Sequence, residues 1–143
     1  MNTAPSEKRY ADIALNEQAS FAVTVTEALV NEFSKVSGDA SPLHMDDAYA
    51  STTQFGRRVA HGMIAGALFS RLVGMHLPGK YAVYLSQTLR FHEPVFIGDE
   101  ITVTGVVTHK TDAAKTITIK TTVENARSKK LLVSGEAMVS VLQ

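Results

Sequence analysis

The sequence predicts an α+β fold in which an antiparallel sheet curls around one central helix. Two observations lead to this prediction. Residues 61–75 are apolar or small on nearly every side of a helix, which is typical of a buried helix. From residue 81 onward, apolar and polar residues alternate in four long segments separated by turn-like breaks, as in an antiparallel sheet. One buried helix followed by such a sheet implies that the sheet wraps around the helix.

Length and charge limit the classes of protein and partner. With 143 residues, the chain suits one domain, residues 1–143, with a core of its own. Apolar residues make up 45% and charged residues 20%, which is ordinary for a globular protein. Fourteen basic residues balance fourteen acidic ones, so no overall field attracts nucleic acid or an anionic membrane. We therefore expect neither a nucleic-acid nor a membrane partner.

Cysteine is absent, which excludes disulfides, thiolate nucleophiles and cysteine-bound zinc. The first 18 residues are polar and lack the apolar stretch of a signal peptide. The longest apolar run, 62–69, is too short to span a bilayer. The expected compartment is the cytoplasm.

The first part of the chain reads as a leader over residues 1–18 followed by three short elements. Alternation over 21–26 predicts a strand. Apolar residues at helical spacing predict an amphipathic helix over 27–36, and Gly38 suits the left-handed position after it. Two aspartates at the start of 46–50 favour a second short helix, because acidic side chains stabilise a helix N-terminus.

The second part predicts four antiparallel strands that follow one another as a meander. Breaks fall at Pro94, Gly98–Asp99, Thr111–Asp112 and 125–129. The residues expected to share one face within each strand are Tyr81, Val83, Leu85, Leu89 and Phe91; Ile101, Val103 and Val107; Ile117, Ile119 and Val123; and Leu131, Val133, Ala137, Val139 and Val141.

The segment SGDASPLHMD places an acid, Asp39, five residues before a histidine, His44. Pro42 lies between them and argues against a regular helix, so irregular backbone is expected to turn both side chains toward one point. Gly62 follows about fifteen residues later and opens the apolar helix, so its N–H is expected to face a cleft. An acid, a base and an N–H donor are the groups needed to move protons beside a carbonyl.

These residues and their surroundings resemble a known family. The runs SGDASPLHMDDAYA, FGRRVAHGM, LFSRLVG and FHEPVFIGDEI are similar to those of MaoC-like (R)-specific enoyl-CoA hydratases, and the resemblance covers nearly the whole chain. It implies the hotdog fold, a sheet wrapped around a long central helix. It also implies hydration of a trans-2-enoyl-CoA to an (R)-3-hydroxyacyl-CoA, without metal or redox cofactor and by a homodimer. Coenzyme A is then part of the substrate.

Position by position, the resemblance implies roles for four residues. Asp39 and His44 match the catalytic pair, and Gly62 matches the residue whose N–H receives the thioester oxygen. Ser70 matches a serine close to the catalytic acid. Ser41 is a departure, because the family usually has asparagine there, and serine lacks the second donor of an amide.

Each residue also has a purely structural interpretation. Asp39 could cap the turn after the first helix, and His44 could be an ordinary loop histidine. Gly62 could permit close packing, and Ser70 could bond the Gly66 carbonyl. His61 is expected to orient its turn or to cap a neighbouring carbonyl.

Several further alternatives stay open at this point. A metal triad of His44, Asp46 and His61 is a minor alternative, and Asp46 is expected to be a helix cap. Arg57 and Arg58 could be solvated, form a salt bridge or contact the phosphates of coenzyme A. For function, the alternatives are a 3-hydroxyacyl-ACP dehydratase of fatty acid synthesis and a non-catalytic acyl-thioester binding module.

Overall fold

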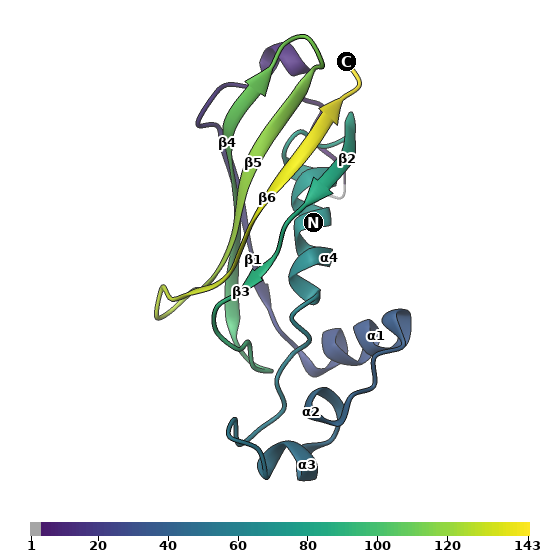
Figure 1. Ribbon diagram of the computed structural model, residues 1–143, viewed down its shortest axis with the longest axis vertical. Coiled ribbons are helices and arrows are strands. Elements are labelled where there is room, and N and C mark those ends of the chain that lie inside the picture. The colour runs from purple at the N-terminus through teal and green to yellow at the C-terminus, as the bar shows by residue number, and fades with distance from the viewer. Residues whose placement is uncertain (1–3) are drawn as a thin grey trace.

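The computed structural model describes residues 4–143 and has the predicted architecture, an antiparallel sheet of six strands curved along a central helix (Figure 1). A 3₁₀ turn, Tyr10–Asp12, comes first. The helices are α1 (Glu27–Ser37), α2 (Pro42–Met45), α3 (Asp47–Ser51) and α4 (Ile64–Arg71), and the strands are β1 (Gln18–Thr24), β2 (Ala82–Gln87), β3 (Arg90–Phe91), β4 (Glu100–Thr111), β5 (Thr116–Asn125) and β6 (Leu131–Val141). Figure 1 shows α1, α2 and α3 gathered beyond the N-terminal end of α4.

Only three of the four predicted strands form the meander. The order in the sheet is β1-β4-β5-β6-β2, with β3 also pairing with β6, so the segment after α4 lies beyond β6 and not beside β4. The reason is that β1 pairs with β4 from Gln18, opposite Val106, to Thr24, opposite Glu100. Since β5 occupies the other edge of β4, no edge remains there for β2.

The face predicted for this segment is also wrong in part. Tyr81 and Leu89 pack against the core, whereas Val83, Leu85 and Phe91 are 40%, 54% and 51% exposed. The register with β6 shifts after Tyr84, and the strand breaks near Thr88. At this break the Thr88 carbonyl lies so close to β6 that a side chain at Gly135 would collide with it. These two irregularities interrupt the alternation on which the prediction depended.

The central helix begins later than predicted and is covered on one side only. Residues 62–63 form a turn, α4 starts at Ile64, and a π-helical turn over Leu72–His76 continues it. The buried residues of α4 are Ile64, Ala65, Leu68 and Phe69. Ala67 and Ser70 are exposed, so the prediction of a helix buried all round is wrong for a single chain. In the described part of the chain, no helix has the length and apolar character to cross a membrane.

The predicted position of helix α1 is confirmed, and the helix leads into the loop that carries Asp39. The Thr26 side chain accepts a hydrogen bond from the Leu29 N–H and caps its start. Gly38 ends it at φ 78°, in the left-handed region, and donates its N–H to the Ser34 carbonyl at 2.9 Å. This turn directs the following residues away from the axis of α1.

The next two helices are short, and one of them corrects the expectation of irregular backbone. Pro42 does not exclude a helix: it is the first residue of the one-turn helix α2, a position where its missing N–H costs nothing. Asp46 is confirmed as a helix cap, because its side chain accepts a hydrogen bond from the Tyr49 N–H at the start of α3. His44 therefore lies on a tight helical turn and not on a flexible loop.

The described part of the predicted leader is packed against the domain. Tyr10 and Ile13 are 5% and 2% exposed and join a core cluster with Val73 and Leu77. The main core, built from β1, β4, β5, β6 and α4, reaches the helical end where Asp39 and His44 lie. The packing of the sheet against α4 therefore supports that end of the molecule.

Candidate active site

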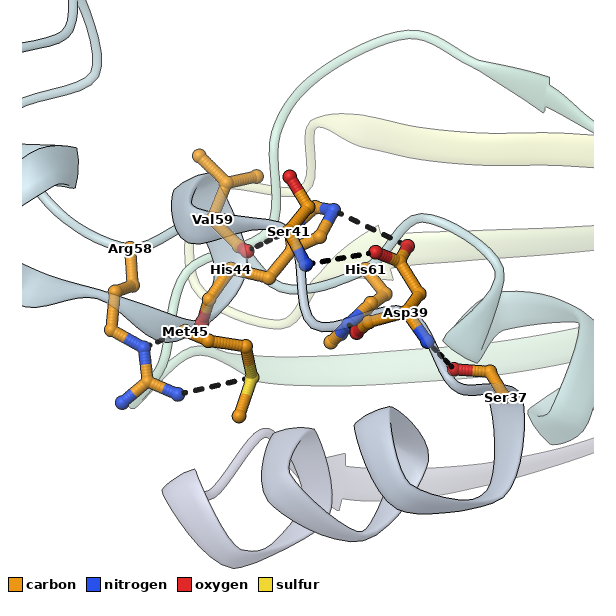
Figure 2. Close-up of polar contacts among 8 residues, drawn as sticks. All are labelled: Ser37, Asp39, Ser41, His44, Met45, Arg58, Val59 and His61. Atoms are coloured by element: carbon orange, nitrogen blue, oxygen red, sulfur yellow. Dashed lines mark hydrogen bonds and ion pairs between the residues drawn. The ribbon is translucent and has the colours of Figure 1, made fainter.

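Asp39 and His44 face each other at the edge of a cavity of about 740 Å³. The distance from His44 Nε2 to Asp39 Oδ2 is 3.9 Å (Figure 2). This separation is too long for a direct hydrogen bond, but one water molecule can bond to both groups across it. The His44 side chain is 18% exposed and the Asp39 side chain 48% exposed, so both are reachable from the cavity.

The environment of His44 fixes which ring nitrogen is free. Its Nδ1 lies 2.6 Å from the carbonyl oxygen of Val59. Because a carbonyl only accepts hydrogen bonds, Nδ1 carries the proton in the neutral ring, and Nε2 keeps a lone pair. That lone pair is on the side of Asp39 (Figure 2). The geometry makes His44 suited to accept a proton at Nε2.

The loop around Asp39 is held by short local hydrogen bonds. The Asp39 N–H donates to Ser37 Oγ at 3.1 Å, and Asp39 Oδ1 accepts the Ser41 N–H at 3.1 Å. The second oxygen, Oδ2, stays free to face His44. Ser41 acts through its backbone, since its carbonyl accepts the His44 N–H at 2.9 Å, and its hydroxyl has no hydrogen bond within residues 4–143. The capping interpretation of Asp39 and its orientation toward His44 therefore coexist.

His61 lies beneath this pair and contacts both members. Its Nε2 is 2.8 Å from the carbonyl oxygen of Asp39, and its ring stacks on His44 with centroids 4.1 Å apart. Phe33 covers the ring on another side at 4.9 Å. The residue is 3% exposed, and its Nδ1 has no partner in the described part of the chain. His61 thus caps a neighbouring carbonyl and supports the ring of His44.

Gly62 lies at the turn that opens α4 and lines the same cavity. Its carbonyl accepts the Ala65 N–H at 3.1 Å, whereas its own N–H has no hydrogen bond within residues 4–143. The ring of Phe91 covers the place where a side chain of Gly62 would stand. An unpaired N–H at the start of a helix is a donor available to an oxygen atom with developing negative charge.

Ser70 is the one predicted site residue that the structure does not bring to this group. It lies on the exposed side of α4 and is not part of the cavity. Within residues 4–143 its hydroxyl makes no hydrogen bond with Asp39 or with the carbonyl of Gly66. In a single chain neither interpretation of Ser70 has geometric support.

The structure decides between the alternatives for Arg58, whereas Arg57 has no acidic partner among residues 4–143. Arg58 is 6% exposed and forms a salt bridge with Glu27 at 3.1 Å. Arg57 is exposed, and its guanidinium lies 3.9 Å from the centre of the Phe96 ring. Nothing in the sequence separates two adjacent arginines in this way, because the distinction arises from the direction in which each side chain leaves the loop.

The sequence also did not reveal the apolar walls of the cavity. They include Phe33, Phe55, Met63, Phe91 and Val95, which come from α1, two loops, the turn before α4 and β3. Phe33 and Met63 were expected in helices and Phe91 on the face of a strand, whereas Phe55 and Val95 carried no signal. The cavity is therefore mainly apolar. Its polar lining consists of Asp39, His44 and His61 together with Ser37, His92 and Glu93, an arrangement suited to an apolar ligand with a polar reacting centre.

The predicted metal alternative is wrong in its choice of acid. Asp46 caps α3, and the group of potential ligands consists of Asp39, His44 and His61, whose ligand atoms lie within 4.8 Å of one another. The two imidazole rings are stacked with 29° between their planes. Lone pairs lie in the ring planes, so those of two stacked rings do not converge on one ion. This arrangement favours proton transfer over metal binding.

Comparisons with known proteins identify the family of this chain. The MaoC like domain model matches residues 13–128. An (R)-specific enoyl-CoA hydratase of Rhodospirillum rubrum is 39% identical over 132 residues, which cover 92% of this chain and 90% of the relative.

Among solved structures, R-hydratase PhaJ1 from Pseudomonas aeruginosa has a TM-score of 0.90 and 39% identity, covering 94% of this chain and 86% of that one. The (R)-hydratase from A. caviae involved in PHA biosynthesis has a TM-score of 0.87 and 39% identity, covering 90% of this chain and 97% of that one. The fold is therefore that of the hotdog hydratases, and the chain belongs to the MaoC-like domain family.

Proposed function

We propose that the protein is an (R)-specific enoyl-CoA hydratase, which adds water to a trans-2-enoyl-CoA and forms an (R)-3-hydroxyacyl-CoA. The observation that carries this proposal is the 3.9 Å gap between Asp39 Oδ2 and His44 Nε2 at the edge of an apolar cavity. Two proton acceptors that face one water-sized gap are suited to activate that water. The relationship to hydratases over nine-tenths of the chain supports the same reaction.

In the proposed mechanism, the water bonds to Asp39 and His44 at once. His44 Nε2 accepts one proton of the water, because its Nδ1–H is committed to the Val59 carbonyl. Asp39 Oδ2 accepts the second hydrogen bond and orients the oxygen toward C3 of the substrate. The oxygen bonds to C3, and the proton held by His44 passes to C2 on the same face. Water is thereby added across the double bond, and the pair returns to its starting state.

Gly62 has the complementary role in this proposal. As oxygen attacks C3, negative charge develops on the thioester oxygen, and the unpaired N–H of Gly62 is suited to receive it. His61 keeps the acid and the base in position through the Asp39 carbonyl and the His44 ring. We assign Ser41 a bracing role through its backbone, and Ser70 has no role within one chain.

The proposed enzyme is a homodimer. The exposed side of α4 and the exposed edge strand β2 support this state, because a second chain would cover both. Val83, Leu85 and Met138 are 40%, 54% and 42% exposed and lie on the neighbouring strands β2 and β6. Apolar side chains gathered at a free sheet edge are typical of an interface.

We propose no metal or organic cofactor, since each step above is assigned to a protein group, and coenzyme A enters only as part of the substrate. We also propose the cytoplasm as the compartment of this reaction.

The test is direct. The purified protein is incubated with crotonyl-CoA, loss of the conjugated enoyl absorbance is followed, and the configuration of the product is determined. We expect hydration to (R)-3-hydroxybutyryl-CoA. No turnover with a folded protein, or an (S) product, would contradict the proposal.

A further inference from the structure

Arg58 connects the turn that carries His44 with α1 through several hydrogen bonds. Its Nε donates to the main-chain carbonyl of His44 at 2.5 Å. One terminal nitrogen, Nη1, donates to Glu27 at 3.1 Å, and the other, Nη2, donates to Asn31 at 3.2 Å. The side chain of Arg58 is buried, although the preceding residue, Arg57, is exposed.

The bond to His44 satisfies a carbonyl that the local helix leaves open. The helix α2 has one turn, Pro42–Met45, so the carbonyls at its C-terminal end have no N–H partner within it. An arginine donor at that end stabilises the turn. Since the side chain of Arg58 is buried, this hydrogen bond is shielded from water and stronger than a surface one.

The neighbouring residue holds the other parts of the same turn. The Val59 N–H donates to the Leu43 carbonyl at 3.2 Å, and the Val59 carbonyl accepts a hydrogen bond from His44 Nδ1 at 2.6 Å. Arg58 therefore bonds to the main chain of His44, and Val59 bonds to its ring. A shift of the main chain of His44 changes the position of its ring.

The salt bridge of Arg58 is the less consequential contact. Glu27 is 65% exposed, and an ion pair with one solvated partner contributes little. The contact with His44 is different, because it determines where the ring lies relative to Asp39 Oδ2. A displacement of about 1 Å in a reacting group costs about 100-fold in rate.

We infer that Arg58 is a positioning residue, which acts through the main-chain carbonyl and the ring of His44. This inference rests on the proposed function, in which His44 Nε2 accepts the proton of the water. The essential atom is Nε, and the positive charge is secondary. That distinction makes the inference testable at a single position.

Two substitutions of Arg58 separate the atom from the charge. Lysine has a methylene group where arginine has Nε, so Arg58→Lys keeps the charge near Glu27 but loses the donor to His44. Glutamine has its amide nitrogen at the place of Nε, so Arg58→Gln keeps that donor and loses the charge. Arg57→Lys is the matched control, because Arg57 is exposed and contacts no site residue in the described part of the chain.

The measurements are kcat and KM with crotonyl-CoA, thermal melting, and the ring-nitrogen chemical shifts of His44 by NMR. We expect Arg58→Lys to lower kcat by about 10- to 100-fold with KM nearly unchanged. Its His44 signals should shift toward a mixture of the two neutral tautomers. Arg58→Gln should keep kcat within about threefold of the parent while it lowers the melting temperature. Arg57→Lys should change neither kcat nor the His44 signals.

The opposite order would overturn the inference: normal kcat and unchanged His44 signals in Arg58→Lys, with loss of kcat in folded Arg58→Gln. Equal losses in both variants with unchanged His44 signals would also overturn it, because they would indicate a general structural role. If one variant does not fold, the His44 signals and kcat of the other decide. Inactive parent protein would contradict the proposed function, whereas the His44 signals would still test Arg58.

Discussion

Replacing Gly62 by valine tests whether its N–H takes part in catalysis or whether the glycine only permits close packing. Gly62 does not have a positive φ, so its backbone accepts a residue with a side chain. A β-carbon at this position would lie 2.9 Å from Cε1 and 3.0 Å from Cδ1 of Phe91. Ordinary contact begins at 3.4 Å, so the ring has to move by about 0.5 Å. The change therefore acts on the cavity beside the N–H and on one aromatic neighbour.

The two effects differ in size. Phe91 is 51% exposed, and an exposed ring moves more easily than a buried one. The cost to stability is therefore expected at the low end of overpacking, about 1 kcal/mol. For a domain of this size, that lowers the melting temperature by about 3 to 5 °C. If the thioester oxygen needs the Gly62 N–H, a bulky side chain beside it should cost about 100- to 1000-fold in kcat, as does the loss of an oxyanion donor.

The assay measures kcat with crotonyl-CoA and thermal melting on the same preparation of Gly62→Val. Gly66→Ala is the matched control, because its β-carbon would lie 3.6 Å from Leu89, an ordinary contact. The control should keep its turnover and gain up to about 1 kcal/mol from the better helix propensity of alanine. A fall of more than about 10 °C in Gly62→Val, with normal turnover of the folded fraction, would refute the oxyanion role.

Three further outcomes are expected. Activity should survive exhaustive chelation, because every step is assigned to a protein group; loss of activity that zinc or iron restores would point to a metal instead. Burial lowers the pKa of His76 from 6.5, and the charge of Arg71 adds to this, so the unfolded chain binds more protons and stability should fall as the pH drops below about 6.5. His76→Phe keeps the stacking on Phe21 and should weaken this dependence in denaturant titrations across that range, whereas an identical dependence would exclude His76 as its source. Leu85→Asp should convert the proposed dimer to a monomer in sedimentation experiments, by placing a charge on the exposed edge strand; an unchanged dimer would place the interface elsewhere.

The parts of the fold predicted from the sequence are those determined by local pattern. The helix α1 and its glycine end follow from spacing and from one left-handed position. The strands β4, β5 and β6 follow from alternation. The predicted face of β6 is wrong at Leu131, which is 38% exposed, whereas Leu132 beside it is buried. The place of β2 depends on which strand edge is already occupied by β1, a non-local fact. The exposed side of α4 was predicted to be buried. The composition of the helix shows that this side is apolar or small, but it does not show whether another part of the chain covers it.

The candidate site was likewise predicted from the sequence only in part. Asp39, His44, His61 and Gly62 were identified from their spacing, and the structure brings all four to one cavity. Ser70 was expected near Asp39, but it lies on the exposed side of α4. Arg58 could not be distinguished from Arg57, because its role depends on an open carbonyl at the end of a one-turn helix that the sequence did not predict.

The central claim is that Asp39 and His44 act together on one water. The most direct test is kcat with crotonyl-CoA for Asp39→Asn, His44→Ala and the double variant, each checked for unchanged melting. Each single variant should lose most of its activity. The kcat of the double variant should equal that of the less active single variant, because both substitutions remove the same activated water. Near-normal turnover in either folded single variant, or losses that multiply in the double variant, would contradict the claim.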